Sequence, residues 1–259
     1  MKIALGIEYS GSQFSGWQIQ SSQRTVQNCL EQALSRVANH PIKIVAAGRT
    51  DSGVHALQQV VHFDTSVERN ERNWILGLNT NLPNDVNVTW AKPVTDDFSA
   101  RFSALSRHYR YIIINPVSRS ALHADRMWWL FSPLDEMRMQ AAADLLLGHH
   151  DFSAFRAKDC QANNPVKTLI KLHVTRHDDC IAIDVQSQSF LHHMVRNIVG
   201  VLVLIGQGKK PVIWARQVLE SRDRGQGGIT SPPQGLYFVN VDYPAKYDLP
   251  TVSTFPVVW

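Results

Sequence analysis

Residues 47–55 read AGRTDSGVH and lie between two short strand patterns, residues 42–46 and 59–65. Glycine at each end of the polar run allows the backbone to bend sharply and lets a ligand approach closely. Asp51 lies at this bend with Arg49 two residues before it, and a carboxylate in such a place is a candidate nucleophile or base. An aspartate that only caps its own turn is the alternative, and spacing alone favours neither.

The sequence on either side of this bend alternates strand and helix patterns. Residues 2–9 have apolar side chains at every second position, which predicts a strand, and residues 25–38 carry an apolar stripe at helical spacing with Thr25 as N-cap. Further strands are predicted over 86–92, 107–115, 167–176, 180–187 and 235–242, and further helices over 73–78, 134–147, 192–205 and 211–221. Residues 222–234 are predicted to be an exposed loop. This mixture of antiparallel-looking strands and helices predicts an α+β fold in which helices cover one face of each sheet.

The composition describes a globular chain with a substantial core. Its 259 residues are 44% hydrophobic and 19% charged, and the net charge of +4 leans only mildly toward a polyanionic partner. The three cysteines lack a CxxC spacing, so we expect neither a disulfide framework nor a cysteine zinc site, and we expect a reducing cytoplasm. The first residues do not form a signal-peptide pattern, and no apolar stretch reaches the ~18 residues of a membrane span, so no membrane association is expected.

Two segments combine basic and aromatic residues. Residues 101–111 read RFSALSRHYRY, in which Arg101 and Arg107 are suited to phosphates and the tyrosines to stacking on a base. An edge strand with its tyrosines in the core is the alternative. Residues 150–158 place Arg156 beside aromatic residues, which is typical of a phosphate-contacting loop and equally of a loop that ends a helix.

Residues 190–200 read FLHHMVRNIVG and begin an apolar helix. A charge such as Arg196 needs a partner there, for which Asp51 is a candidate, unless the side chain reaches solvent. The adjacent histidines do not share a helix face, so the spacing of a two-histidine metal pair is missing and we expect no metal site.

Together these segments resemble the tRNA pseudouridine synthase A (TruA) family. The resemblance rests above all on AGRTDSGVHA followed by VVHF, on RFSA followed by YRY, and on FLHHMVRNIVG. The matching pieces run in the family order and span nearly the whole chain: 9–18, 47–63, 98–115, 150–156, 190–200 and 235–243.

The resemblance implies an isomerase that converts uridine to pseudouridine at positions 38, 39 and 40, in the anticodon stem-loop of tRNA. It also implies a fold of two similar α+β halves, each with a mainly antiparallel sheet, and a basic cleft between them. In this chain the halves would be residues 1–105, with the catalytic aspartate, and residues 106–259, with the stacking tyrosine and the partner arginine. Family members are homodimers, so a homodimer that binds tRNA is expected.

The resemblance further implies roles for individual residues. Asp51 is the catalytic aspartate, Arg196 pairs with its carboxylate, and Tyr109 stacks on the uracil ring. Arg49 helps to extrude the nucleotide and contacts the RNA, and Leu236 forms part of the apolar wall of the pocket.

The chain departs from the family pattern at three positions. Ser10, Ser52 and Gln58 stand where aspartate, alanine and glycine are usual. Ser10 and Gln58 bear on the details of RNA contact, whereas the aspartate, the arginines and the stacking tyrosine follow the pattern.

Pseudouridine formation breaks the bond from ribose to N1 of uracil, turns the base and rejoins it through C5. Nothing is added or lost, so no cofactor is expected. An ionised aspartate can remove a proton from the ribose, giving a glycal-like intermediate, or attack the sugar or ring covalently, and the sequence does not choose between these routes. The base must first leave its stack, which costs a few kcal/mol, and stacking on an aromatic ring, worth ~1–3 kcal/mol per base, offsets much of that cost.

Two other functions compete with this interpretation. A non-catalytic RNA-binding module would use the same aromatic and basic surface but needs no particular acid. A small-molecule hydrolase using Asp51 and His55 would need a serine elbow, a metal-ligand set or a second paired acid, and the segment supplies none of these.

Overall fold

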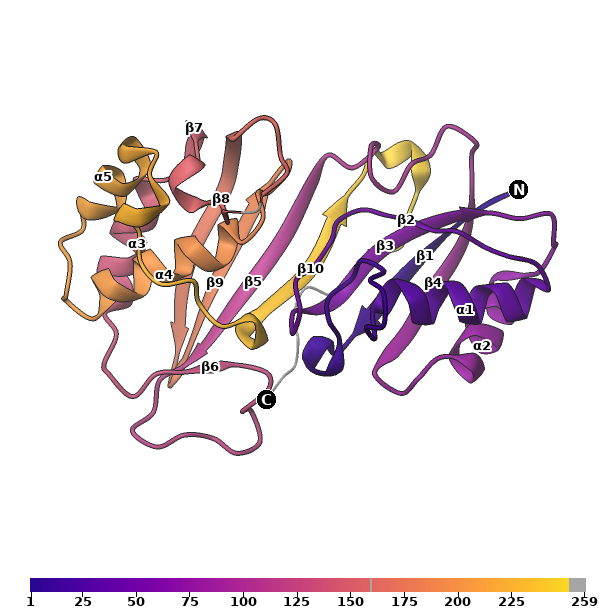
Figure 1. The fold of residues 1–259 in the computed structure, drawn as a ribbon, viewed down its shortest axis with the longest axis horizontal. Helices are drawn as coiled ribbons and strands as arrows, with labels where there is room; N and C mark the ends of the chain where they lie inside the picture. Colours follow the sequence, from indigo (N-terminus) through magenta and orange to yellow (C-terminus); the bar gives the residue numbers. More distant parts are fainter. Residues whose placement is uncertain (159, 252–259) are drawn as a thin grey trace. The chain divides into compact units, whose positions relative to one another are not determined.

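The computed structural model describes residues 1–158 and 160–251, which divide into two compact units (Figure 1). The first unit consists of residues 1–107 together with the described residues from 237 on, and the second of residues 108–236. The end of the described chain therefore packs with its beginning, and the functional division after residue 105 stays a prediction. Among the described residues, no helix combines the length and apolar character needed to cross a bilayer.

The first unit is built on strands in the order β4-β1-β3-β10, with β2 beside β3. These are β1 (Lys2–Tyr9), β2 (Val45–Ala46), β3 (His55–Asp64), β4 (Val86–Val94) and β10 (Leu236–Asp242). Strand β1 pairs antiparallel with β3 and β4, whereas β10 pairs parallel with β3 through Tyr237 and Phe238. Ile3, Leu5 and Ile7 on one face of β1 and Ala4 on the other are completely buried, so this strand, which lies between β4 and β3, is covered on both faces.

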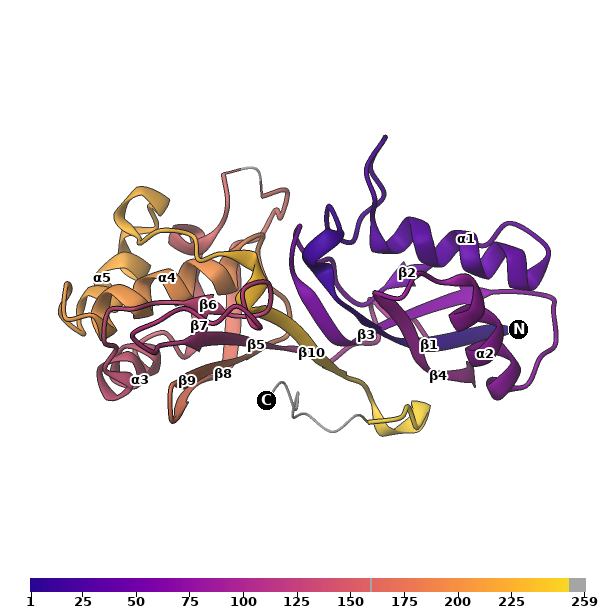
Figure 2. The same ribbon diagram turned by 90° about the horizontal axis from the view of Figure 1, so that it is seen from below.

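Two helices of the first unit, α1 (Val26–Ala38) and α2 (Glu71–Asn81), contact each other, and α2 packs against β4. Figure 2 shows α1 running alongside the strands. Thr25 occupies the N-cap position as predicted, but its side chain makes no capping bond, and its buried hydroxyl has no hydrogen-bond partner among the described residues. The carbonyl of Gly16 instead accepts the N–H of Val26, at 3.3 Å. The start of α1 is thus tied to the loop that precedes it.

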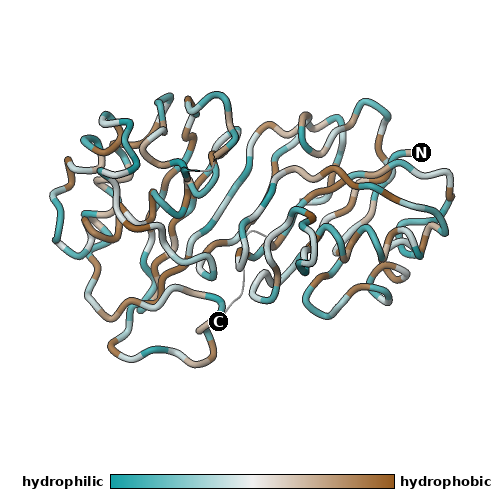
Figure 3. Tube along the Cα trace, viewed as in Figure 1, coloured by the Kyte–Doolittle hydropathy of each residue, from teal (hydrophilic) through white to brown (hydrophobic). Residues whose placement is uncertain are grey.

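The second unit has strands in the order β5-β9-β8-β7, with β6 parallel to β5. Its strands are β5 (Ser106–Ile114), β6 (Trp128–Trp129), β7 (Gly148–Asp151), β8 (Val166–His177) and β9 (Cys180–Ser187). Its helices are α3 (Glu136–Asp144), α4 (Met194–Gly206) and α5 (Trp214–Ser221), which contact one another, and α3 packs on β8. Helix α4 is buried along nearly its whole length, and apart from Arg196 and Asn197 in its first turn it is apolar. In Figure 3 the hydrophobic colours gather on the inner strands and helices of each unit, whereas the outlying loops are mostly hydrophilic.

The predicted α+β class is confirmed, and most predicted elements are present. The parallel pairs β3–β10 and β5–β6 make the strand pairing mixed. Helix α2 is longer than the predicted 73–78, because Asn70 caps it and accepts the N–H of Asn73. Residues 148–151 form strand β7 where a loop was expected. The predicted loop 222–234 contains one short 3₁₀ helix, Arg224–Gln226, and a second, Pro233–Gly235, begins at its end.

Candidate active site

Asp51 lies in the turn between β2 and β3, in the first unit. Its carbonyl accepts the N–H of Val54 at 3.2 Å, and Gly53 adopts a φ of +79°, a region that favours glycine. Asp51 is half-buried, whereas Arg49 and Ser52 on either side are exposed. The glycine predicted to permit a sharp bend therefore does so, two residues after the aspartate.

Residues 11–17 form a second loop that packs directly on this turn. The N–H of Gly53 donates to the carbonyl of Phe14 at 3.3 Å. Gly16 has a φ of +87°, and a Cβ at this position would lie 2.8 Å from the carbonyl oxygen of Thr50. The two loops thus meet backbone to backbone, which only a glycine at residue 16 permits.

Buried polar side chains hold the same turn from inside the first unit. The amide of Gln59, which is fully buried, accepts the N–H of Gly48 at 3.3 Å and donates to its carbonyl at 2.8 Å. The hydroxyl of Tyr9 lies 2.7 Å from Oγ1 of Thr50, next to Asp51 in the chain. Burial raises the pKa of Tyr9, so this hydroxyl stays protonated. Two buried side chains, Gln59 and Tyr9, therefore bond to the segment on the N-terminal side of Asp51.

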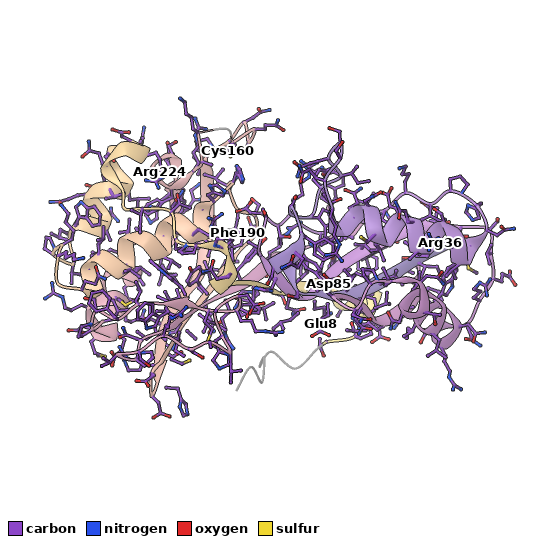
Figure 4. All side chains as sticks on the ribbon, turned by 60° about the horizontal axis from the view of Figure 1, so that its bottom comes forward. Glu8, Arg36, Asp85, Cys160, Phe190 and Arg224 are labelled. Carbon is purple, nitrogen blue, oxygen red and sulfur yellow. The ribbon has the colours of Figure 1, made fainter. Side chains whose placement is uncertain are left out.

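Tyr109 lies on β5 in the second unit and is 8% exposed. Its ring meets that of Phe190, labelled in Figure 4, edge to face, with 5.0 Å between ring centroids and planes at 82°. Such a pair is a favourable aromatic geometry and fixes the plane of the tyrosine ring.

Arg196 lies in the first turn of α4, also in the second unit. Its Nε donates to the carbonyl of Ser231 at 2.7 Å, and the N–H of Ser231 donates to the carbonyl of Arg196 at 3.2 Å. A Cβ on Gly200, one turn further along α4, would lie 1.8 Å from the carbonyl oxygen of Ile229. The segment 228–232 therefore lies directly on the helix at Gly200 and orients the guanidinium of Arg196. We call this segment the α4 strap.

Asn197 connects the α4 strap with the loop that carries Arg156. Its side-chain nitrogen donates to the carbonyl of Phe155 at 2.7 Å. Its Oδ1 accepts from the hydroxyl of Thr230 at 2.6 Å and from Nη2 of Arg224, labelled in Figure 4, at 3.1 Å. The side chain is 2% exposed and bonded at both ends of its amide, so it fixes three chain segments at once.

The other predicted site residues differ in exposure. Arg49 and Arg101 are exposed, Arg156 is half-buried, and Leu236 is buried. Arg107 is half-buried and donates to backbone carbonyls of its own unit. The first unit carries Arg49, Asp51, Arg101 and Arg107, and the second carries Tyr109, Arg156, Arg196 and Leu236.

The three residues that depart from the family pattern, Ser10, Ser52 and Gln58, each donate a hydrogen bond to a main-chain carbonyl of the first unit. The N–H of Ser10 donates to the carbonyl of Asp85 at 3.0 Å, and Oγ of Ser52 donates to the carbonyl of Phe14 at 3.1 Å. Gln58 is buried and donates to the carbonyl of Pro250 at 3.0 Å. Gln58 therefore helps to hold the last described residues of the chain on the first unit.

Sequence reasoning missed Gln59, Asn197 and Gly200. Gln59 and Asn197 each lie among apolar residues, in a predicted strand and a predicted helix. This position indicates a buried amide, and a buried amide requires hydrogen-bond partners. That signal does not identify the partners, which lie 11 residues away for Gln59 and 42 and 33 residues away for Asn197.

The family model described as tRNA pseudouridine synthase matches residues 6–103 and 142–244, which include Asp51 and Arg196. This chain belongs to the tRNA pseudouridine synthase family, and its members are isomerases. It is similar to proteins named tRNA pseudouridine synthase A from several bacteria. The protein from Nitrosococcus oceani is 55% identical over 100% of both chains, that from Alcanivorax borkumensis 54% identical over 99% of this chain and 96% of its own, and that from Pseudomonas aeruginosa 52% identical over 96% and 88%.

A solved structure described as a Cbf5-Nop10-Gar1 complex aligns with 91% of this chain and 57% of its own chain. The TM-score is 0.33 and the sequence identity 8%, so this likeness carries no argument about the site.

Proposed function

We propose that this chain isomerises uridine to pseudouridine at positions 38, 39 and 40 in the anticodon stem-loop of tRNA, with Asp51 as the catalytic carboxylate. Family membership supports tRNA as the substrate and pseudouridine as the product. The observation that carries the role of Asp51 is its place on a turn whose backbone is held by Gln59, by the loop 11–17 and by the positive φ of Gly53. Catalysis depends on such fixed placement of the reacting group.

The reaction needs a group that can activate the ribose or the ring and then release it. The bond between N1 and C1′ breaks, a bond between C5 and C1′ forms, the proton on C5 leaves and N1 gains a proton. A carboxylate can remove a ribose proton and return it, or form and then break a covalent bond, so either route leaves Asp51 unchanged after a turnover.

The other site residues receive the roles that the family resemblance implies. We propose that Arg196 pairs with Asp51, that Tyr109 stacks on the target uracil and that Leu236 lines the base pocket. The edge-to-face contact with Phe190 supports a stacking role for Tyr109, because it leaves the ring plane defined before a base arrives.

Phosphate contacts would come from the arginines that lie at the surface. Arg49 and Arg101 are exposed, and Arg156 is half-buried beside the buried Phe155. Each such contact releases counterions from the RNA, so tRNA binding is expected to weaken as salt rises. We also propose that the protein acts as a homodimer in the cytoplasm, which light scattering of the purified protein and fractionation of cells test directly.

The experiment that tests the role of Asp51 follows tritium released from tRNA labelled at uracil C5. The Asp51→Asn variant keeps the size of the side chain and removes its negative charge, so we expect no release above background while tRNA binding persists. Asp64→Asn changes an exposed carboxylate at the end of β3 and serves as the matched control, with release like that of the wild type.

Full release by Asp51→Asn would refute the assignment of the catalytic residue. The positions are tested with three transcripts that each keep a single uridine at 38, 39 or 40. Release from all three supports the proposed substrate range, and release only from uridines elsewhere in the tRNA contradicts it.

A further inference from the structure

Arg107 directs its guanidinium at the main chain of its own unit. Nε and Nη2 both donate to the carbonyl of Ala47, at 3.2 and 3.0 Å. Nη2 also donates to the carbonyl of Arg101 at 2.6 Å, and Nη1 donates to that of Ala104 at 3.4 Å. One planar group therefore links two chain segments that are more than 50 residues apart in the sequence.

The first of these segments ends in the turn of Asp51. Ala47 is buried, and its N–H donates to the carbonyl of Val60 on β3 at 2.8 Å. Its carbonyl is the group that Arg107 holds, so both sides of this residue are fixed. The next residue, Gly48, is held on both its N–H and its carbonyl by Gln59. The backbone on the N-terminal side of the turn is therefore hydrogen-bonded to residues of β3 as far as residue 48.

The second segment is itself anchored to the core of the first unit. The N–H of Ala100 donates to Nδ1 of the buried His62 at 3.0 Å, and its carbonyl accepts the hydroxyl of Tyr243 at 2.6 Å. Burial raises the pKa of Tyr243, so this hydroxyl remains a donor. Arg107 therefore ties the turn to a part of the unit that is held independently.

The chemistry of the guanidinium suits this task. Arginine presents N–H donors in a rigid plane and stays charged at all working pH values, so it can serve three carbonyls at once. Lysine offers a single nitrogen at the end of a flexible chain and cannot reach the same three oxygens in that geometry. Bonds from a charged donor are also stronger than bonds between neutral groups.

We infer that Arg107 is a positioning residue, which holds the backbone of residues 47–53 so that the carboxylate of Asp51 meets the ribose or the ring in a reactive geometry. The inference rests on the proposed catalytic role of Asp51. It differs from the expectation that Arg107 contacts the RNA, and the two roles predict opposite effects on rate and affinity.

The test uses two substitutions that separate charge from geometry. Arg107→Lys keeps the charge and loses the planar group, and Arg107→Gln loses both. If Arg107 positions the turn, both variants lower the single-turnover rate at saturating tRNA by about 10- to 100-fold, because small displacements of a reacting group cost that much. In both, the Kd for tRNA and its salt dependence stay within about twofold of the wild type.

A phosphate contact would give the opposite result. Arg107→Gln would then raise the Kd and reduce the salt slope by about one, with the saturated rate intact, and Arg107→Lys would be nearly normal. That outcome overturns the inference, and so does a wild-type rate in both variants.

Arg36→Lys, on the exposed face of α1 (labelled in Figure 4), is the matched control and should match the wild type in rate and affinity. The assay runs below the melting temperature of each variant, at 15 °C if required, so that a loss of stability is not read as a loss of rate. Hydrogen exchange of peptides covering residues 47–53 gives a second readout. Faster exchange confined to this turn supports the inference, and unchanged exchange there contradicts it.

Asp51→Asn in the same assay keeps the two proposals distinguishable. If Asp51→Asn is active, the proposed function fails whatever Arg107 does. If Asp51→Asn is inactive and both Arg107 variants have wild-type rates, only the positioning role fails.

Discussion

The two units hold their key residues by opposite means. In the first unit the turn of Asp51 is irregular backbone, and side chains such as Gln59 and Arg107 reach its carbonyls and N–H groups. In the second unit Arg196 lies on a regular helix, and the α4 strap lies on that helix where Gly200 leaves room. The backbone N–H and carbonyl groups of a turn lack partners within the turn and must bond to side chains or to other segments. The backbone of a helix is bonded internally, so only the side chain of Arg196 needs a contact that orients it.

The largest effect is expected where backbone meets backbone in the second unit. Gly200→Ala would place a Cβ 1.8 Å from the carbonyl oxygen of Ile229, so the α4 strap must move and Arg196 must lose its bond to Ser231. We expect a loss of about 3 kcal/mol in the free energy of unfolding and a fall of about 10²-fold in the rate at saturating tRNA. Denaturant titration and tritium release measure the two quantities.

Gly206→Ala on the same helix is the matched control for this prediction. Its Cβ would meet the side chain of Met139 rather than a backbone carbonyl, so we expect a smaller loss in both quantities. Equal losses in the two variants would show that the α4 strap has no special role.

A smaller effect is expected from the amide that holds the turn in the first unit. Gln59→Met keeps the volume but removes the partners of the N–H and the carbonyl of Gly48, which is half-buried, and we expect a cost of about 1 kcal/mol in the free energy of unfolding. We expect the saturated rate of tritium release to fall as well, because the turn gains freedom.

Gln58→Met, at the neighbouring position, removes the bond to the carbonyl of Pro250 and leaves the partners of Gly48 in place, so it should cost stability without lowering the saturated rate. A rate loss that is the same in both variants would contradict the idea that the first unit holds Asp51 through Gln59.

The hydrogen bond between Asn197 and Thr230 of the α4 strap should contribute no more to the free energy of unfolding than the bonds of Gln59. Thr230→Val keeps the shape of the side chain and removes the hydroxyl that donates to Asn197 and accepts from Arg224, at a cost of about 1 kcal/mol. Thr175→Val on the exposed face of β8 is the control, and urea titration of both variants measures the difference. A loss as small as that of the control would mean that Asn197 holds the strap without Thr230.

The smallest effect concerns pH and the first unit. Burial, together with the charge of Lys2, lowers the pKa of His62 below its ordinary value of 6.5. Its Nδ1 accepts the N–H of Ala100, which requires the neutral ring. The unfolded chain therefore binds this proton more readily, so stability is fully present above pH 6.5 and declines as pH falls toward the lowered pKa.

His62→Gln keeps an acceptor for Ala100 and removes the titration, so its melting temperature should fall less than that of the wild type between pH 7.5 and 5.5. His177→Gln, where the side chain is 92% exposed, should keep the wild-type slope. A wild-type slope in His62→Gln would rule out His62 as the source of the pH dependence.

Much of the fold followed from local patterns. The alternation in residues 2–9 predicted β1, and the apolar stripe of residues 25–38 predicted α1 to within one residue. Strand β7 was missed because Gly148-His149-His150-Asp151 has no apolar alternation, and it forms through antiparallel pairing with β8. The capping bond expected of Thr25 failed because backbone carbonyls from the preceding loop already serve the start of α1.

The sequence by itself determined the class of fold, the family and the sharp turn at Asp51, because these depend on residue types at short spacings: glycine at a bend, period-two and helical stripes, and motifs such as AGRTDSGVHA. Only the tertiary structure decided that Arg107 donates to the carbonyl of Ala47, 60 residues away, and that residues 237–251 join the first unit. Every residue carries the same main-chain carbonyl, so any donor that folding brings near can bond to it. The residue types around Ala47 therefore do not indicate that its carbonyl will accept from Arg107.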